Sequence, residues 1–390
     1  MRTAFVWADS LAAYRFGPEH PLDPRRLELA VSLIRRLGLA GDADSPIVAP
    51  RMATDDELLL SHAPEYIDAV RRASAGELSP AEAAAFGLGT EDVPVFPGMH
   101  EAGLAIVGAT LTAAEQVMSG AATRAFSIAG GLHHARRAEA AGFCVYNDLS
   151  VAIRWLQREH SARVLYLDVD AHHGDGVQWI HYADPDALTL SFHESGAFLF
   201  PGTGFIEETG EGDGYGYSVN VPLDVQTEDG SFLDAFRRLV PEIADAYRPD
   251  VILLQCGCDA HALDPLTHLR CSTNLYEAVV RETVAVADRV CDGRVIMTGG
   301  GGYAIHTVVP RAWTLAWAGL RGIEAHDALP DDWMHAVRLE SGSDVPCTLR
   351  DAPDAYPSPR REEIAHNNAR TVAAVRRRVL PLITGWGLGF

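Results

Sequence analysis

The chain has 390 residues, of which 47% are hydrophobic, and this composition predicts a folded protein with a substantial core. All 32 basic side chains are arginines, so the chain excludes Schiff-base catalysis, pyridoxal-phosphate attachment and a phosphate-binding P-loop, each of which needs a lysine. The 53 acidic residues give a formal net charge of −21, which disfavours nucleic acid and anionic membranes as partners and favours cationic ones.

Cysteine usage and the N-terminal segment both bear on the compartment. The six cysteines are scattered and form no C-x-x-C pair, which is typical of reduced thiols in a cytoplasm. The first residues lack the apolar core of a signal peptide, and no apolar run approaches the about 18 residues of a membrane span. We therefore expect a cytoplasmic protein that is neither exported nor inserted in a membrane.

The first 120 residues predict amphipathic helices at 24–37, 55–73 and 100–119, with a long surface loop at 87–98. From residue 125 onward, short apolar strands alternate with amphipathic helices, and strands that are apolar on both faces indicate a parallel sheet covered by helices. The expected strands are 125–131, 163–170, 187–193, 250–257 and 294–302, and the expected helices are 148–160, 232–247, 272–291 and 303–320. The pattern predicts one large α/β domain, with an irregular stretch at 351–363 before a final arginine-rich helix.

Histidine is concentrated in one region, since seven of the sixteen histidines lie between residues 133 and 193. The expected strand at 163–170 runs into Asp168, Asp170 and His172, and a period of two would place these three side chains on one side. Burying them without a cation is expensive, so the pattern favours a metal site over a salt-bridged acidic turn.

A second strand, at 250–257, leads to Asp259 at the same carboxyl edge of the sheet. Together with Asp170 and His172 it would form an oxygen, nitrogen, oxygen ligand set with an open position, which suits catalytic zinc. Cys256 and Cys258 are competing ligands, but their C-x-C spacing on a strand favours packing in the core.

A third strand, at 125–131, is followed by His133 and His134. Alone, two adjacent histidines are more typical of a satisfied buried pair, but with Asp168 and Asp175 they can form two His-Asp dyads. A fourth strand ends in four glycines and Tyr303, whose phenol could donate a hydrogen bond to a developing oxyanion.

Six motifs occur in this order along the chain: GGLHHA, GFCVYND, DVDAHHGDG, FPGTG, CGCDAH and GGGGY. Their order and separations resemble the zinc-dependent histone deacetylase family of the arginase/deacetylase superfamily. The segment 14–22, the loop FGLGTEDVPVF and the string DAHALDPLTHL look most similar to the bacterial acetoin-utilization deacetylases. The resemblance implies a single three-layer α/β/α domain with a central, mostly parallel sheet over residues 1–322. Residues 323–390 would be a C-terminal extension packed on the same domain.

The resemblance also implies a role for each matching residue. The metal ligands would be Asp170, His172 and Asp259. The catalytic residues would be His134 as general base with Asp175, His133 with Asp168 as an electrostatic dyad, and Tyr303 as oxyanion donor. The substrate-binding residues would be Asp92, Gly142, Phe143, Phe200 and Leu266, and a potassium ion would lie at Asp168, His172, Ser191 and Phe192.

These residues predict a deacetylase that removes acetyl groups from lysine ε-amines of proteins such as acyl-CoA synthetases, with Zn²⁺ or, in the cell, Fe²⁺, and with K⁺ as a structural ion. Its partner would be an acetylated protein or peptide, not nucleic acid or membrane, and the sequence leaves the oligomeric state open. Three alternatives remain: an acetylpolyamine amidohydrolase, a two-manganese ureohydrolase and a non-catalytic acetyl-lysine-binding protein. The acetylpolyamine amidohydrolase is disfavoured because Leu266 is apolar, whereas an acidic residue would be expected to recognise a charged polyamine. The two-manganese ureohydrolase is disfavoured because one carboxylate-rich motif and Asp259 supply too few bridging carboxylates for two metal ions.

Overall fold

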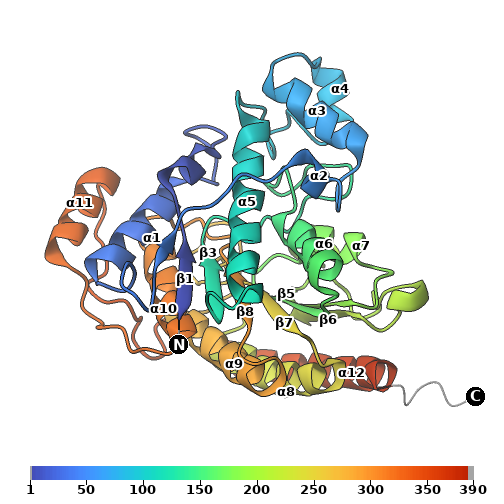
Figure 1. Cartoon of the computed structure of the whole chain (residues 1–390). Coiled ribbons are helices and arrows are strands. Elements are labelled where there is room, and N and C mark those ends of the chain that lie inside the picture. Colours follow the sequence, from blue (N-terminus) through green and yellow to red (C-terminus); the bar gives the residue numbers. More distant parts are fainter. Residues whose placement is uncertain (1, 385–390) are drawn as a thin grey trace, which may run out of the picture.

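Eight parallel strands form one central sheet in the computed structural model, which describes residues 2–384 (Figure 1). The strand order is β2-β1-β3-β8-β7-β4-β5-β6. The strands are β1 (Thr3–Val6), β2 (Ile47–Val48), β3 (Arg124–Ser127), β4 (Val164–Asp168), β5 (Ala187–Glu194), β6 (Ser218–Leu223), β7 (Val251–Gln255) and β8 (Val295–Thr298). The interior strands are apolar and buried on both faces, which is why helices must cover both sides of the sheet.

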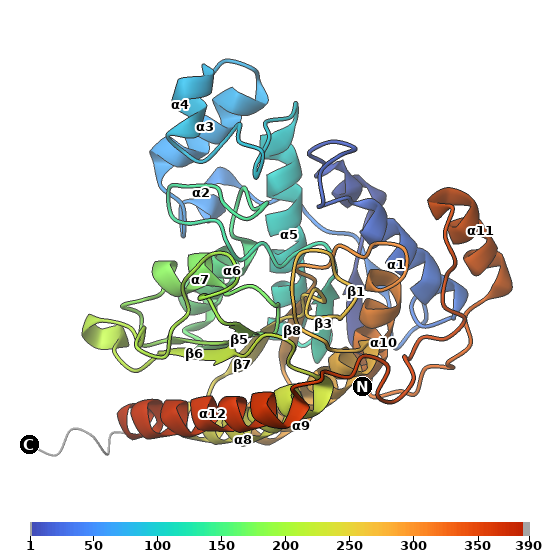
Figure 2. The same ribbon diagram turned by 180° about the vertical axis from the view of Figure 1, so that it is seen from behind.

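Helices cover the sheet as two layers, which Figures 1 and 2 show from opposite sides. One layer consists of α5 (Met99–Met118) and α6 (Asp148–His160), and α5 is apolar almost all round because it lies between the sheet and outer helices. In the other layer, neighbouring helices pack side by side in the order α10, α9, α8 and α12. Their bounds are α10 (Val309–Arg321), α9 (Thr273–Val290), α8 (Asp229–Tyr247) and α12 (Arg361–Ile383). The three-layer prediction is confirmed, and every strand pair is parallel.

Shorter helices complete the chain outside these layers. The first helix, α1 (Arg25–Arg36), packs against α10 and α11 (Asp331–Ser341). The others are the 3₁₀ turns η1 (Asp9–Ala13) and η2 (Gly212–Gly214), and the helices α2 (Asp55–Leu58), α3 (Pro64–Ser74), α4 (Pro80–Ala84) and α7 (Asp175–Ile180). In the part of the chain described, no helix is long and apolar enough to cross a membrane.

Two expected helices begin or continue differently from the prediction. The helix expected at 55–73 is divided into α2 and α3, because Pro64 lacks an N–H and starts a new helix. The helix expected at 303–320 begins only at Val309, with Pro310 in its first turn. The prediction also omitted β1, the two-residue β2, and β6, which contains Pro222.

The segment after residue 322 packs on the same sheet. Helix α12 lies against α8 and β6, and the Asn368 side chain accepts a hydrogen bond from Asp224 N at 2.9 Å and donates one to Thr227 Oγ1 at 2.8 Å. Arg376 forms an ion pair with Glu242 of α8. The expected boundary at 322 stays a prediction, and the end of the extension, 385–390, lies outside the described residues.

Candidate active site and metal centre

The candidate site lies at the carboxyl ends of four neighbouring central strands, β3, β8, β7 and β4. The last residues of these strands are paired in register: Ser127 with Thr298, Thr298 with Gln255, and Gln255 with Asp168. Because the four strands end in one row, the segments that follow them meet above the same edge, where open α/β sheets bind ligands. The register thus brings together residues as distant in sequence as Ser127 and Thr298, which are 171 positions apart.

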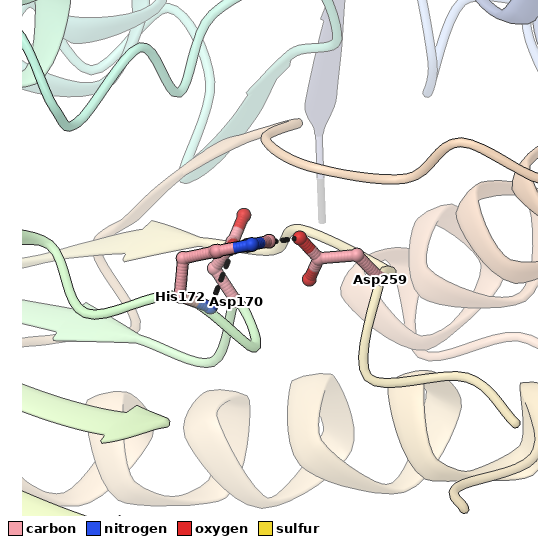
Figure 3. Close-up of side chains that lie close together, drawn as sticks. All are labelled: Asp170, His172 and Asp259. Carbon is pink, nitrogen blue, oxygen red and sulfur yellow. Dashed lines mark hydrogen bonds and ion pairs between the residues drawn. The ribbon is translucent and has the colours of Figure 1, made fainter. Parts of the chain in front are cut away.

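Asp170, His172 and Asp259 form the candidate metal centre (Figure 3). One possible ligand atom from each residue lies within 4.8 Å of the others, and all three residues are buried. Nδ1 of His172 lies 2.8 Å from Oδ2 of Asp259 and 3.3 Å from Oδ1 of Asp170. The structure therefore assembles the predicted ligand set from the ends of β4 and β7.

The chain places these ligands by hydrogen bonds rather than by strand alternation. Strand β4 ends at Asp168, so the expected period of two does not extend to Asp170 and His172. Instead, Asp168 Oδ1 accepts a hydrogen bond from Asp170 N, and Asp170 Oδ1 accepts one from His172 N. Asp259 Oδ1 accepts from Ala171 N at 2.7 Å, which ties the two segments together. Two consecutive aspartate-capped turns thus aim the ligands.

The electrostatics of the ligand set fit a divalent cation. Burial and the adjacent Asp170 carboxylate raise the pKa of Asp259 to about 7, because two buried carboxylates cannot both be ionised without a compensating charge. Asp170 Oδ2 already accepts from Gln255 Nε2 at 2.8 Å and Gly301 N at 2.7 Å, which orients it as a ligand. A Cβ at Gly301 would lie 2.1 Å from Asp259 Oδ2, so the glycine bed is required for this close approach.

Cys256 and Cys258 belong to the core. Both are fully buried, and burial raises the pKa of the Cys256 thiol to about 12 and that of Cys258 well above its usual range. Neither sulfur belongs to the group of candidate ligand atoms that the described residues bring together. These two cysteines therefore pack as the sequence predicted.

His133 and His134 form the two predicted dyads. His133 Nδ1 donates to Asp168 Oδ2 at 2.8 Å, and His134 Nδ1 donates to Asp175 Oδ1 at 2.8 Å. The two Nε2 atoms lie 3.0 Å apart, a distance that accommodates one proton between the rings. At least one of the two imidazoles is therefore neutral.

The two imidazoles differ in their charge. Burial disfavours a charged His133, but Asp168 and Asp170 outweigh it and raise the pKa of His133 to about 9. Burial and the nearby charge of His133 lower the pKa of His134 to about 4. His134 is therefore a neutral ring at pH 7 that can accept a proton, and His133 is a fixed positive charge beside it.

Four residues to which the sequence assigned no role hold this cluster in place by hydrogen bonds. Tyr166 donates to Asp168, Arg136 Nη2 donates to Asp175 Oδ2 at 3.0 Å, and Gln255 donates to Asp170. Asp264 Oδ2 accepts from Tyr303 N at 2.7 Å, and burial raises the pKa of Asp264 to about 6. Tyr166 could have been found as an i, i−2 neighbour of Asp168 on the same strand face, but the others depend on tertiary contacts.

Tyr303 follows the glycine run after β8, as predicted. Burial, with the carboxylates of Asp259 and Asp170, raises the pKa of Tyr303 well above its usual range, so its hydroxyl stays protonated and can donate a hydrogen bond. The Arg26 guanidinium fixes the glycine run by donating to the carbonyls of Gly300 and Gly302. Tyr303 is therefore held beside the metal centre as a neutral donor.

Aromatic side chains from two loops stand beside this cluster. The Phe143 ring lies 5.7 Å from the Tyr303 ring, and the Phe200 ring lies 5.1 Å from the His134 ring. Asp92 Oδ2 accepts from Gly142 N at 2.7 Å, which joins the loop at 87–98 to the Phe143 loop. A Cβ at Gly142, where φ is +55°, would lie 2.2 Å from the His134 ring, so only glycine fits there. Asp92, Gly142, Phe143 and Phe200 thus lie beside the cluster, and their contact with substrate stays a prediction.

Leu266 and the proposed potassium residues lie beside the same cluster. Leu266 N donates to Asp264 Oδ1, so Leu266 is adjacent to the brace of Tyr303. Ser191 is the register partner of Asp168, and Glu194 N donates to the carbonyl of Ala171, next to His172. Phe192 follows on the same buried strand. Substrate contact by Leu266 and potassium binding stay predictions.

Known proteins resemble the chain over nearly its whole length. The histone deacetylase domain model matches residues 20–320. Acetoin utilization protein AcuC of Bacillus subtilis is 49% identical over 372 residues, covering 95% of this chain and 96% of that protein. AcuC of Staphylococcus xylosus is 42% identical over 375 residues, covering 96% of this chain and 97% of that protein.

Solved structures agree with these sequence relatives. The crystal structure of a histone deacetylase homologue from Aquifex aeolicus is 30% identical, with a TM-score of 0.84 over 95% of this chain and 100% of that chain. A histone deacetylase homologue complexed with SAHA gives a TM-score of 0.85 at the same identity and coverage. The resemblance drawn from the six motifs is thereby confirmed. The chain belongs to the histone deacetylase family and is a metal-dependent hydrolase related to the acetoin utilization proteins.

Proposed function

We propose that the enzyme hydrolyses the amide of N-ε-acetyl-lysine in proteins or peptides, with Zn²⁺ as its metal. One observation carries this proposal: a neutral His134, a protonated Tyr303 hydroxyl and an Asp-His-Asp ligand set converge at one buried site. A bound divalent cation would act as a Lewis acid and lower the pKa of water at this site. Oxygen and imidazole donors with an open position suit zinc, and ferrous iron is the alternative in the cell.

The chain's own residues supply the remaining chemistry. His134, neutral and oriented by Asp175, accepts a proton from the attacking water and then passes it to the leaving amine. Tyr303 donates a hydrogen bond to the oxygen that becomes negative, and the charged His133 stabilises the same charge through space. The protons balance, since the one taken from water is the one delivered to lysine.

The surroundings of the site support an acetylated lysine as substrate. Phe143 and Phe200 are apolar walls suited to a methylene chain, and the partly exposed Asp92 retains a second carboxylate oxygen for a peptide amide. The formal charge of −21 favours lysine-rich substrates. The enzyme itself contains no lysine, so none of its own side chains can be an acetyl-lysine that competes with the substrate. We propose acetylated protein as the partner, with no role for nucleic acid or membrane.

The test is acetate release from an acetyl-lysine peptide by enzyme loaded with Zn²⁺, Fe²⁺ or Co²⁺. We expect turnover with at least zinc, and the absence of turnover with all three metals would contradict the proposal. Acetylspermidine, assayed in parallel, should be a poorer substrate, and preference for it would favour a polyamine hydrolase instead. An acetylated acyl-CoA synthetase is the first protein substrate to assay, and omission of K⁺ from the buffer tests the structural ion. The cytoplasmic location stays a prediction, supported by six unpaired cysteines.

A further inference from the structure

A basic pocket lies on the outer side of the His134–Asp175 dyad. It has a volume of about 490 Å³, and its lining includes Arg136, Arg137, Arg154, Glu139 and Trp179. Three guanidinium groups and one carboxylate line the pocket. The carboxylates of Asp175 and Asp184, which pair with Arg136 and Arg154, offset this charge, so Arg137 is the guanidinium that stays available to a ligand.

The three arginines differ in how far the protein already uses them. Arg154 is paired with Asp184 at 2.8 Å, and Arg136 is paired with both Asp175 and Glu139. Arg137 is exposed and makes no side-chain hydrogen bond or ion pair among residues 2–384. Arg137 thus keeps its N–H donors available beside the partly exposed Arg136, and guanidinium donors of this kind bind phosphate groups.

Trp179 gives the pocket a second chemical feature. It is 38% exposed, and its ring packs against the Tyr182 ring, with the two centroids 4.8 Å apart and the planes tilted by 51°. An indole held in place and open to solvent is a surface on which a flat heterocycle can stack. The pocket therefore offers both a phosphate site and a stacking surface.

Arg136 connects the pocket to the reaction centre. Its side chain is 41% exposed on the pocket side, whereas its partner Asp175 is fully buried. Arg136 Nη2 donates to Asp175 Oδ2, and the other oxygen of Asp175 accepts from His134. A ligand that engages this guanidinium competes directly with Asp175 for its N–H groups.

We propose that this pocket binds an organic phosphate carrying a flat aromatic ring, the chemistry of a nucleotide, and that its occupancy loosens Arg136 from Asp175. Loosening Arg136 leaves Asp175 less firmly held, and His134 is then less well oriented. Bound ligand would therefore lower turnover without occupying the substrate site. The binding step is independent of the proposed deacetylation, and only its effect on turnover rests on that proposed function.

Calorimetry on the metal-loaded enzyme tests binding, with ADP, pyrophosphate and adenosine as probes. Excess Mg²⁺ is added so that ADP and pyrophosphate do not chelate the metal of the enzyme. We expect ADP to bind more tightly than pyrophosphate, and adenosine not to bind. Arg137→Gln should raise the Kd for ADP about tenfold by removing charge-assisted hydrogen bonds, whereas Arg158→Gln, elsewhere on α6, should not. Trp179→Leu should weaken ADP but leave pyrophosphate unchanged.

Steady-state kinetics then test the coupling. Saturating ADP should lower kcat with KM unchanged, and Arg137→Gln should keep the basal kcat while losing this response at the same ADP concentration. Arg136→Gln should lower the basal kcat, and Arg136→Lys should restore part of it. The proposal is wrong if ADP fails to bind, or if Arg137→Gln and Arg158→Gln bind it equally. The coupling is wrong if ADP binds at Arg137 yet leaves kcat unchanged.

Discussion

The two dyads place the same pair of residue types in opposite charge states. In each, a histidine Nδ1 lies 2.8 Å from an aspartate oxygen, and the two histidines are adjacent in sequence. Yet the pKa of His133 is raised to about 9 and that of His134 is lowered to about 4. His133 faces two carboxylates, Asp168 and Asp170, whereas His134 is buried beside the charged His133 and faces the single carboxylate of Asp175. The number of charges around a dyad, rather than the dyad itself, therefore decides its role.

Replacing the two histidines separately should expose this difference most strongly. We expect His134→Ala to lower kcat by about 10²–10⁴, the range for losing a general base. His133→Ala should cost less, because the proton acceptor remains. The measurement is kcat on an acetyl-lysine peptide, with metal content and circular dichroism checked for both variants. Equal losses in the two variants would mean that the dyads share one role.

Tyr303→Phe tests the other source of charge stabilisation. Removing one preorganised hydrogen-bond donor should lower kcat by about 10²–10³. Metal content should not change, since the Tyr303 hydroxyl is outside the Asp-His-Asp set. An unchanged kcat would assign the oxyanion stabilisation to the charged His133 alone, and so would sharpen the contrast between the dyads.

Gln255→Ala tests how far the ligands depend on their own hydrogen bonds. Gln255 Nε2 donates to Asp170 Oδ2 at 2.8 Å, and losing such a bond to a metal ligand typically weakens metal affinity by about 10–100-fold. Competition with a chelator, followed by metal analysis, measures this change. Gln157→Ala, which removes a partly buried glutamine of α6 that donates to Asp184, is the control and should leave the affinity unchanged.

The sequence was enough to predict that Asp170, His172, Asp259, the two His-Asp pairs and Tyr303 lie together, because most of them lie at or within a few residues of the carboxyl end of a strand of the parallel sheet. Apolar strands with alternating helices fix which edge their carboxyl ends share, so residues that follow different strands can be predicted to meet. Strand β2 was not predicted because two residues carry no period, and β6 was not predicted because Pro222 interrupts its pattern. Length does not explain the omission of β1, since β3 and β8 also have four residues and were predicted.

What could not be predicted are the contacts that tune the site. The opposite pKa shifts of His133 and His134 depend on burial, on Asp170 and on the charge that His133 itself carries. The direction of the Asp170 side chain is set by a turn and not by a strand period. The expected alternation through Asp168, Asp170 and His172 fails for the same reason, since the strand ends at the first of them. Tertiary hydrogen bonds, such as Asp264 to Tyr303 N, leave no local pattern in the sequence.

A third histidine–aspartate pair shows that such a pair does not by itself imply catalysis. His261 Nε2 lies 2.8 Å from Asp351 Oδ2, and Asp351 also binds Arg311 and accepts from Thr273 N. Despite burial, these partners hold the pKa of Asp351 well below its usual range. Asp351 belongs to the segment after residue 322, so this pair joins that segment to the rest of the domain.

Asp351→Asn should therefore lower stability and leave kcat unchanged. Breaking a buried, hydrogen-bonded ion pair costs about 3 kcal/mol, measured as the free energy of unfolding in urea at pH 7. The pKa of Asp351 is lower in the folded state than in the unfolded state, where it is about 4. Its contribution to the free energy of unfolding is therefore complete above about pH 4 and is lost as the pH falls toward the folded-state pKa. The difference between wild type and variant should thus shrink below about pH 4. Asp354→Asn, which changes an exposed carboxylate in the same segment, is the control and should change stability little at any pH. A large loss of kcat in Asp351→Asn would contradict a purely structural role for the His261–Asp351 pair.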